Sequence, residues 1–313
     1  MAIAPGHSLV DRGSLTYGPL LRRLDLNMAF CSFLLESKLI ALGESVAAEV
    51  TCEGGSTVDW SSIVRAAFPQ AVVSAMRRPL PTGPQYLPSA PRQAFTVSNV
   101  QQEDLEEFLM VVGHSLTIED RLDESHALAP HTIPLEPGGG FVRTKLGGLV
   151  YKAKDYTKSV PVRNQKAAGE ILDWMTEFID RHPRYARAHT IVTVPSSDPA
   201  RKETLVTYLG RGLAETLGKR LVLPRRIVGV EARKDIDGSR PEFNQEQGAT
   251  AVLAGDLQGE AIIIIDDLYK TGDSMAEVCG LCRKTGAIEV LGLVATKNAT
   301  ATRGMDLLSW PWG

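Results

Sequence analysis

The segment AIIIIDDLYKTGDSM, residues 261–275, carries the pattern that decides the fold. Five consecutive apolar residues lead directly into Asp266 and Asp267, and a Thr-Gly-Asp-Ser sequence begins at Thr271. An apolar run without alternation is typical of a strand buried on both faces, as in the centre of a parallel sheet. The residues after it have the composition of a turn that opens a helix. The segment therefore predicts a central strand, a turn and a helix.

The surrounding sequence repeats this alternation of strands and helices. Helical spacing of apolar residues alternates with short apolar runs from about residue 141 onward, which predicts a doubly wound α/β fold with a mostly parallel sheet. The expected helices span residues 167–182, 202–219 and 273–287, and the expected strands span residues 188–197, 220–230, 260–268 and 288–297.

The N-terminal part differs in character, and we expect a largely helical accessory region there. Apolar spacing favours helices within residues 29–50, 60–76 and 101–122, with a break at Pro69. The Pro-rich stretch 79–92 predicts no regular element, and PLEPGGGF (134–141) indicates a linker. The expected division is an accessory region over 1–135, an α/β domain over 141–300 and a tail over 301–313.

Composition indicates a globular protein. Of 313 residues, 43% are hydrophobic and 23% charged, and the net charge is -3. Because the net charge gives no overall basic field, nucleic-acid binding is not expected, although net charge does not exclude binding through a local basic patch. No apolar run is long enough to span a bilayer, and the first residues lack the pattern of a signal peptide, so we expect no membrane association and a cytoplasmic location.

Isolated cysteines and histidines give no clear site. Cys279 and Cys282 form a C-x-x-C inside the expected helix 273–287, where packing against a sheet is favoured over redox chemistry. Cys31 and Cys52 are single residues, which argues against a structural zinc. His114 and His126 are isolated, which favours surface or packing roles.

The opening segment also predicts a binding site. Ligands of open α/β sheets bind at the carboxyl ends of the strands, where Asp266 and Asp267 are expected. Burial of an unpaired carboxylate is costly, so both acids should project into a wet cleft. The backbone N–H groups of residues 271–274 would form an anion cradle at a helix N-terminus, with Gly272 allowing close approach. Acids beside an anion cradle suit a sugar phosphate; a capped helix without a ligand is the alternative.

The same segment resembles the phosphoribosyl pyrophosphate (PRPP) motif of type I phosphoribosyltransferases. In that motif four apolar residues precede two acids, an apolar residue, two variable positions, Thr-Gly, a variable residue and Thr or Ser. Weaker similarity to the ComF-like branch covers about residues 148–298, through VYKAKDY, VPSS and IDDLYKTG, whereas residues 1–130 match nothing recognisable. The motif matches at Ile262, Ile263, Ile264, Ile265, Asp266, Asp267, Leu268, Thr271, Gly272 and Ser274.

The resemblance implies a pentosyltransferase that moves the phosphoribosyl group of PRPP to a nitrogenous base and releases pyrophosphate, with Mg²⁺ as cofactor. It implies that Asp266 and Asp267 contact the ribose hydroxyls, and hold Mg²⁺ only through the substrate or water. The segment 232–247 would be a lid or an exposed hairpin. The implied 5′-phosphate loop is Lys270, Thr271, Gly272, Asp273, Ser274 and Met275, and the implied pyrophosphate loop contains Ser196, Ser197, Arg201 and Lys202.

Several alternatives stay open. Lys270 departs from the family pattern, and a protein that senses PRPP or a nucleotide monophosphate without chemistry, or an interaction protein in DNA uptake or defence, is the competing hypothesis. The N-terminal region would be a hood over the acceptor or a module for a protein partner. Trp310 and Trp312 would stack on the base or pack the tail. The sequence identifies neither the base nor the oligomeric state, and a homo-oligomer is compatible with it.

Overall fold

The computed structural model describes residues 31–52, 59–76, 92–134, 141–226 and 251–298, apart from positions 156, 158, 199, 202 and 254. Its strands are β1 (Cys31–Leu42), β2 (Ser45–Cys52), β3 (Val72–Ala75), β4 (Arg92–Ser98), β5 (Leu116–Ile118), β6 (Glu124–Pro130), β7 (Thr132–Pro134), β8 (Phe141–Arg143), β9 (Thr190–Thr193), β10 (Arg220–Val222), β11 (Arg225–Arg226), β12 (Ala251–Val252), β13 (Ala261–Tyr269) and β14 (Glu289–Lys297). Its helices are α2 (Trp60–Ala67), α3 (Gln102–Gly113), α4 (Lys145–Ala153), α5 (Gln165–Arg181), α6 (Pro183–Arg187), α7 (Leu205–Leu217) and α8 (Asp273–Lys284).

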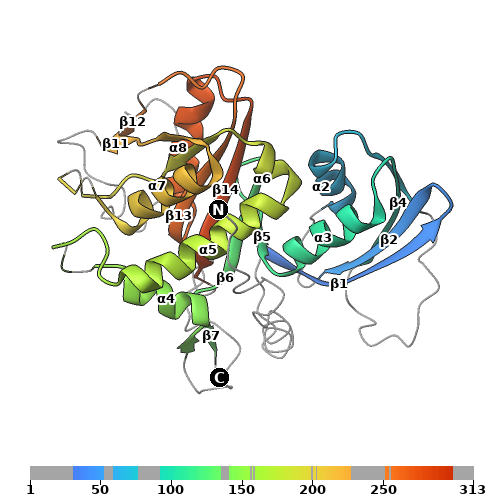
Figure 1. Ribbon diagram of the computed structural model, residues 1–313, viewed down its shortest axis with the longest axis horizontal. Helices are drawn as coiled ribbons and strands as arrows, with labels where there is room; N and C mark the ends of the chain where they lie inside the picture. The colour runs from blue at the N-terminus through green and yellow to red at the C-terminus, as the bar shows by residue number, and fades with distance from the viewer. Residues whose placement is uncertain are drawn as a thin grey trace, which may run out of the picture.

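One ten-stranded sheet connects both parts of the molecule, in the order β10-β9-β13-β14-β6-β5-β1-β2-β4-β3 (Figure 1). The first five strands in this order are parallel to one another. β13 lies at their centre, where Ile263 faces Ile191 of β9 and Leu291 of β14. The expected α/β fold with a mostly parallel sheet is confirmed for this part of the chain.

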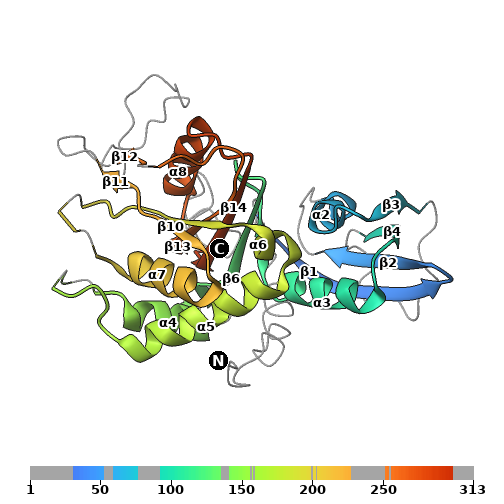
Figure 2. The ribbon, with the colours of Figure 1, turned by 45° about the horizontal axis from the view of Figure 1, so that its top comes forward.

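Helices cover both faces of the parallel strands (Figure 2). On one face α4, α5 and α7 bury a core that includes Ile263 and Ile265, and on the other α8 packs over Ile262 and Ile264. This two-sided burial is the reason that β13 is a continuous run of isoleucines. Cys279 and Cys282 are buried in the α8 core, as expected for packing residues.

The chain reverses its direction of winding between β9 and β13. α7 follows β9 on one face, α8 follows β13 on the other, and the two strands are hydrogen-bonded neighbours. Adjacent strands whose connections leave on opposite faces form a topological switch point, and a crevice opens there at their carboxyl ends. Topology alone therefore places a ligand site beyond Thr193 of β9 and Ile265 of β13.

The N-terminal lobe is an antiparallel sheet, β1-β2-β4-β3, covered on one face by α2 and α3 (Figures 1 and 2). Its core holds Trp60, Phe95, Leu105 and Phe108. Asp59 caps α2 at its start, and a turn at Pro69 separates the helix from β3, as the proline predicts.

The expectation of a largely helical N-terminal region is wrong for the described residues. Residues 31–52 form the β1–β2 hairpin, which turns at Gly43 with a φ of 62°. Val46, Ala48 and Val50 alternate along β2 and all enter the core of the lobe. These three residues follow a period of two, whereas the apolar residues around them also satisfy a helical period, and pairing with β4 decides for a strand.

Other expectations hold with shifted boundaries. The helix expected at 101–122 ends at Gly113, because β5 begins at Leu116. β6 pairs with β14, so the last long strand before the expected linker already lies in the main sheet. The linker glycines, the Pro-rich stretch up to residue 91 and the tail 301–313 lie outside the described residues. Within the described helices, none is long and apolar enough to cross a membrane.

Candidate functional site

The two acids lie near the carboxyl end of β13, as the sequence predicts, but only one is accessible. The strand continues to Tyr269, so Asp266 and Asp267 are its sixth and seventh residues. Asp266 is half-buried, and its Oδ1 accepts the backbone N–H of Asp267 at 2.8 Å. Asp267 is only 4% exposed, which corrects the expectation that both carboxylates project into a wet cleft.

Lys154 explains how Asp267 is buried. Its Nζ lies 3.0 Å from Oδ1 and 2.7 Å from Oδ2 of Asp267. Lys154 is the C-cap residue of α4, and its side chain remains about one-third exposed while the carboxylate does not. Burial of a carboxylate is tolerated when it is paired. The site therefore contains a cation that the motif around Asp267 does not indicate.

Gly272 and Tyr269 shape the turn between β13 and α8. Gly272 has a φ of 83°, and a Cβ there would lie 2.2 Å from the phenolic oxygen of Tyr269. The Tyr269 ring is buried, and its hydroxyl donates to Asp120 Oδ2 at 3.3 Å. Burial raises the pKa of Asp120 above its usual value. Tyr269 thus packs beneath the turn, and only glycine fits above it.

The start of α8 has the features of an anion site. Gly272 is the N-cap residue, and it contributes no side-chain hydrogen bond to the first N–H groups of the helix. Those groups and the helix dipole favour an anion. Thr271 Oγ1 donates to Asp273 Oδ2 at 2.8 Å, so this hydroxyl is held by the first turn. Ser274 and Met275 follow in the same turn, and Lys270 is exposed just before it.

The expected pyrophosphate loop follows β9, across the switch point from the acids. The Oγ of Ser196 accepts the backbone N–H of Asp198 at 3.1 Å, and Ser197 follows it in a bend. Arg201 donates to the backbone carbonyls of Asp155, Val160 and Glu203, so its guanidinium ties loops together. Lys202 and the expected lid 232–247 lie outside the described residues.

A histidine that no sequence motif singles out lies at the same edge of the sheet. His131 follows β6, and its Nδ1 is 3.0 Å from Thr296 Oγ1, whose hydroxyl donates to the backbone oxygen of Asp267 at 3.3 Å. Because that hydroxyl has one proton, Nδ1–H of His131 donates to it and Nε2 remains an acceptor. Burial, with nearby Arg143, lowers the pKa of His131.

A separate hollow of about 280 Å³ lies between the two lobes. Phe68, Glu107, Arg181 and Arg187 are among its lining residues, and none of the predicted site residues reaches it. We place the candidate site at the carboxyl edge, because the acids, the anion-binding turn and the switch point coincide there. In chemical terms this edge offers carboxylates, backbone donors, the ammonium groups of Lys154 and Lys270, and a neutral imidazole.

The comparisons with known proteins give matches among solved structures alone. No family model matches the chain, and no curated protein does. A phosphoribosylpyrophosphate synthetase from Mycobacterium smegmatis is 21% identical with a TM-score of 0.29, over 42% of this chain and 34% of that one. An orotate phosphoribosyltransferase from Aeropyrum pernix is 17% identical with a TM-score of 0.31, over 54% and 74%. An adenine phosphoribosyltransferase from Thermoanaerobacter pseudethanolicus is 20% identical with a TM-score of 0.32, over 46% and 79%.

Proposed function

We propose that the α/β part of this chain binds PRPP and transfers its phosphoribosyl group to a nitrogen nucleophile, releasing pyrophosphate. The observation that carries the proposal is the coincidence of two acids and an uncapped helix N-terminus at the topological switch point. The match of residues 262–274 to the PRPP motif supports the same ligand.

Each part of the ligand has a counterpart among the described residues. The N-terminus of α8, reached through Gly272, suits the 5′-phosphate. The half-buried Asp266 suits the ribose hydroxyls, since a carboxylate accepts two hydrogen bonds without a change of protonation. Asp267 would act behind it, held by Lys154, and the loop with Ser196 and Ser197 would receive the pyrophosphate.

The donor set at this edge is compatible with Mg²⁺. Carboxylate oxygens are the protein ligands that Mg²⁺ prefers, usually together with water and substrate phosphates. Asp266 fits this role, whereas both oxygens of Asp267 already contact Lys154. When bound, the ion would offset the charge of the pyrophosphate.

Glycosyl transfer passes through a state that resembles an oxocarbenium ion, so catalysis depends on positioning and electrostatics. Asp266 would hold the ribose while the turn at Gly272 fixes the phosphate. Neutral His131, with Nε2 as an acceptor at the same edge of the sheet, would receive the proton that the nitrogen nucleophile loses. Lys154 keeps the charge of Asp267 compensated in the absence of ligand.

The variant Asp266→Asn tests the proposal. We expect the wild type to release pyrophosphate from PRPP with Mg²⁺ and a panel of bases, and to gain thermal stability on binding PRPP. Asp266→Asn should lose both effects while its melting temperature without ligand stays close to that of the wild type. Asp256→Asn, an acid away from this edge, is the control. Unchanged PRPP affinity in Asp266→Asn would refute the site.

A second function, PRPP or nucleotide binding without chemistry, is favoured by one observation. The ammonium group of Lys154 contacts both carboxylate oxygens of Asp267, so the negative charge of this acid is already balanced. Lys270 in the phosphate turn would add a further contact to an anionic ligand without supplying a base. A rise in melting temperature with PRPP, without release of pyrophosphate for any base, would select this function.

A further inference from the structure

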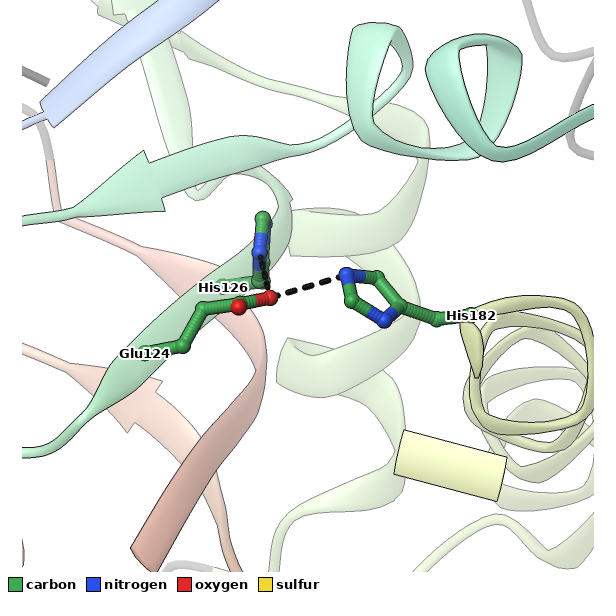
Figure 3. A group of neighbouring side chains, drawn as sticks. All are labelled: Glu124, His126 and His182. Carbon is green, nitrogen blue, oxygen red and sulfur yellow. Dashed lines mark hydrogen bonds and ion pairs between the residues drawn. The ribbon is translucent and has the colours of Figure 1, made fainter. Parts of the chain in front are cut away.

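Three ionisable side chains meet in the interior, away from the proposed PRPP site. Glu124 and His126 lie on β6, and His182 lies between α5 and α6 (Figure 3). All three are buried. Glu124 and His126 belong to the start of β6, whereas His131 follows its end, so about 15–20 Å of strand separates the cluster from the carboxyl edge.

Both imidazoles approach the same carboxylate oxygen. Nε2 of His126 lies 2.9 Å from Glu124 Oε1, and Nε2 of His182 lies 2.8 Å from it. The three possible ligand atoms are within 4.8 Å of one another. Figure 3 shows the two rings reaching Glu124 from different directions. One oxygen and two nitrogens thus converge on one small volume.

His182 contacts Glu124 through one of its two ring nitrogens. Its Nε2 lies 2.8 Å from Glu124 Oε1, whereas its buried Nδ1 has no hydrogen-bond partner among the described residues. A buried polar nitrogen without a partner is costly and calls for an explanation. Two imidazole nitrogens that approach one carboxylate oxygen are in reach of a single ion placed between the three atoms.

His126 is oriented for the same role by Ser115. The Ser115 hydroxyl donates to the backbone oxygen of Val112 at 3.1 Å, and it lies 2.9 Å from Nδ1 of His126. Since the hydroxyl has one proton, Nδ1–H donates to Ser115 and Nε2 of a neutral His126 presents a lone pair to Glu124. Two lone pairs that face each other repel, so either a proton on the imidazole or a metal ion must lie between them. A hydrogen bond on the outer nitrogen is the usual support of a metal-bound histidine.

The surrounding charges leave room for a cation. Arg184 contacts Glu124 Oε2 at 2.8 Å and Glu289 Oε1 at 2.6 Å, so one guanidinium serves two carboxylates. With both histidines neutral, Arg184 offsets only one of the two carboxylate charges, and Arg187 interacts with both from a greater distance. Either a proton on a histidine or a metal ion would supply the missing positive charge.

We propose that Glu124, His126 and His182 bind a divalent transition metal ion, with zinc as the best match. Two imidazoles and a carboxylate are a known zinc ligand set, and imidazole donors favour zinc, copper or nickel over magnesium. The described residues supply three donors, so a water molecule would fill the fourth position. Because the site is buried and distant from the PRPP site, its role is structural.

The ion would fasten the junction between the lobes. The Phe108 ring of α3 packs edge-on against His182, with ring centroids 5.0 Å apart, and Ser115 links His126 to the segment between α3 and β5. Ligands from β6 and from the α5–α6 connection would therefore be held together directly beneath the N-terminal lobe. Loss of the ion should loosen this junction before it affects the carboxyl edge.

Metal analysis of the full chain, purified without chelator and without a histidine tag, tests the proposal. We expect about one zinc ion per chain, and background metal content in Glu124→Gln and His182→Leu. His114→Ala, which removes a histidine at the end of α3, should keep its metal. Wild-type protein stripped by unfolding in chelator should refold with a lower melting temperature, and added zinc should restore it.

If the variants do not fold, the visible absorption of cobalt bound to the wild-type protein still tests the proposal. Wild-type protein refolded with Co²⁺ should show the visible absorption of a four-coordinate cobalt site, and zinc should displace it. Protein that is purified without stoichiometric metal, gives no cobalt spectrum and melts at the same temperature with and without zinc would overturn the proposal. A melting temperature that depends on pH but not on zinc would assign the missing charge to a proton.

Discussion

Gly272 illustrates how a single residue links strand geometry to ligand binding. Its backbone has a φ of 83°, and the buried Tyr269 ring occupies the space that a side chain would need. The turn can therefore bring the first N–H groups of α8 to the surface only with glycine at this position.

Gly272→Ala should lower the free energy of unfolding by about 1–3 kcal/mol, the cost of a strained backbone position. The added Cβ would also push against Tyr269, so PRPP affinity should fall. Gly280→Ala on the same helix is the matched control, because nothing lies within 4 Å of its Cβ. That control should gain up to about 1 kcal/mol from helix propensity. Urea unfolding of both variants measures the difference, and equal stabilities would contradict the assignment.

Lys154→Met should cost about 1–3 kcal/mol of folding free energy, because Asp267 would be left buried without its charged partner. Adding Asp267→Asn to this variant should cost less than the two single changes together, since the pair acts as a unit. A double-mutant cycle by urea unfolding gives the coupling. The exposed pair Arg211–Glu203 is the control, and Arg211→Ala should cost less than about 1 kcal/mol. Additive effects at Lys154 and Asp267 would show that the ion pair contributes nothing.

The sequence predicts on which element a residue lies more readily than it predicts which distant side chain that residue contacts. The apolar run before Asp266 and Asp267 predicts the end of a buried strand, and that prediction is correct. Lys154 lies 113 residues before Asp267, so no local pattern links them. The same holds for Glu124 and His182, whose approach depends on how α5 crosses the sheet.

At the scale of elements, Arg187 connects α6 to the N-terminal lobe. Its Nη1 and Nη2 donate to the backbone oxygens of Ala67 and Ala66, at 2.6 and 2.9 Å. These carbonyls belong to the last turn of α2, where no intrahelical donor is available. Arg187 thus completes the end of a helix in the other lobe.

Arg187→Ala should weaken this connection by about 1.5–3 kcal/mol, the range for hydrogen bonds to a charged group. Amide hydrogen exchange should increase in α2 and remain slow in β13, because only the lobe junction loses contacts. Arg187→Lys keeps the charge without the fork and should restore only part of the protection. Uniformly faster exchange across both lobes would contradict this local role.

The hairpin of β1 and β2 shows why the sequence pattern predicts the wrong element type in the first lobe. Val46, Ala48 and Val50 satisfy a period of two, but neighbouring apolar residues also satisfy a helical period. Pairing with β4, more than 40 residues away in sequence, decides between them. In the α/β part, strands and helices alternate over more than a hundred residues, so the type of each element is clearer from the sequence.

At the scale of the whole molecule, the half-buried environment of His131 makes the free energy of unfolding depend on pH. Its pKa lies below the usual 6.5 because of burial, aided by Arg143, Lys154 and Lys270 and opposed by Asp267. The unfolded chain therefore binds a proton more readily than the folded one as the pH falls through 6.5.

Unfolding free energy should accordingly decrease from about pH 7.5 to about pH 5.5, the range in which an unfolded histidine titrates. His131→Asn should remove part of this decrease, because it removes the group with the lowered pKa. Urea unfolding at several pH values measures both slopes. A steeper slope in the variant would contradict the sign of the shift at His131.

Within the shared sheet, β5 joins the N-terminal lobe to the α/β part. β1 pairs with β5 through Cys31 to Phe33, and β5 in turn pairs with β6. Removal of the first 113 residues would therefore expose the edge of β5 that pairs with β1, and would leave its N–H and C=O groups on that side without partners. An exposed strand edge readily pairs with another chain. We therefore expect the truncated protein to self-associate through β5 rather than to remain a monomer.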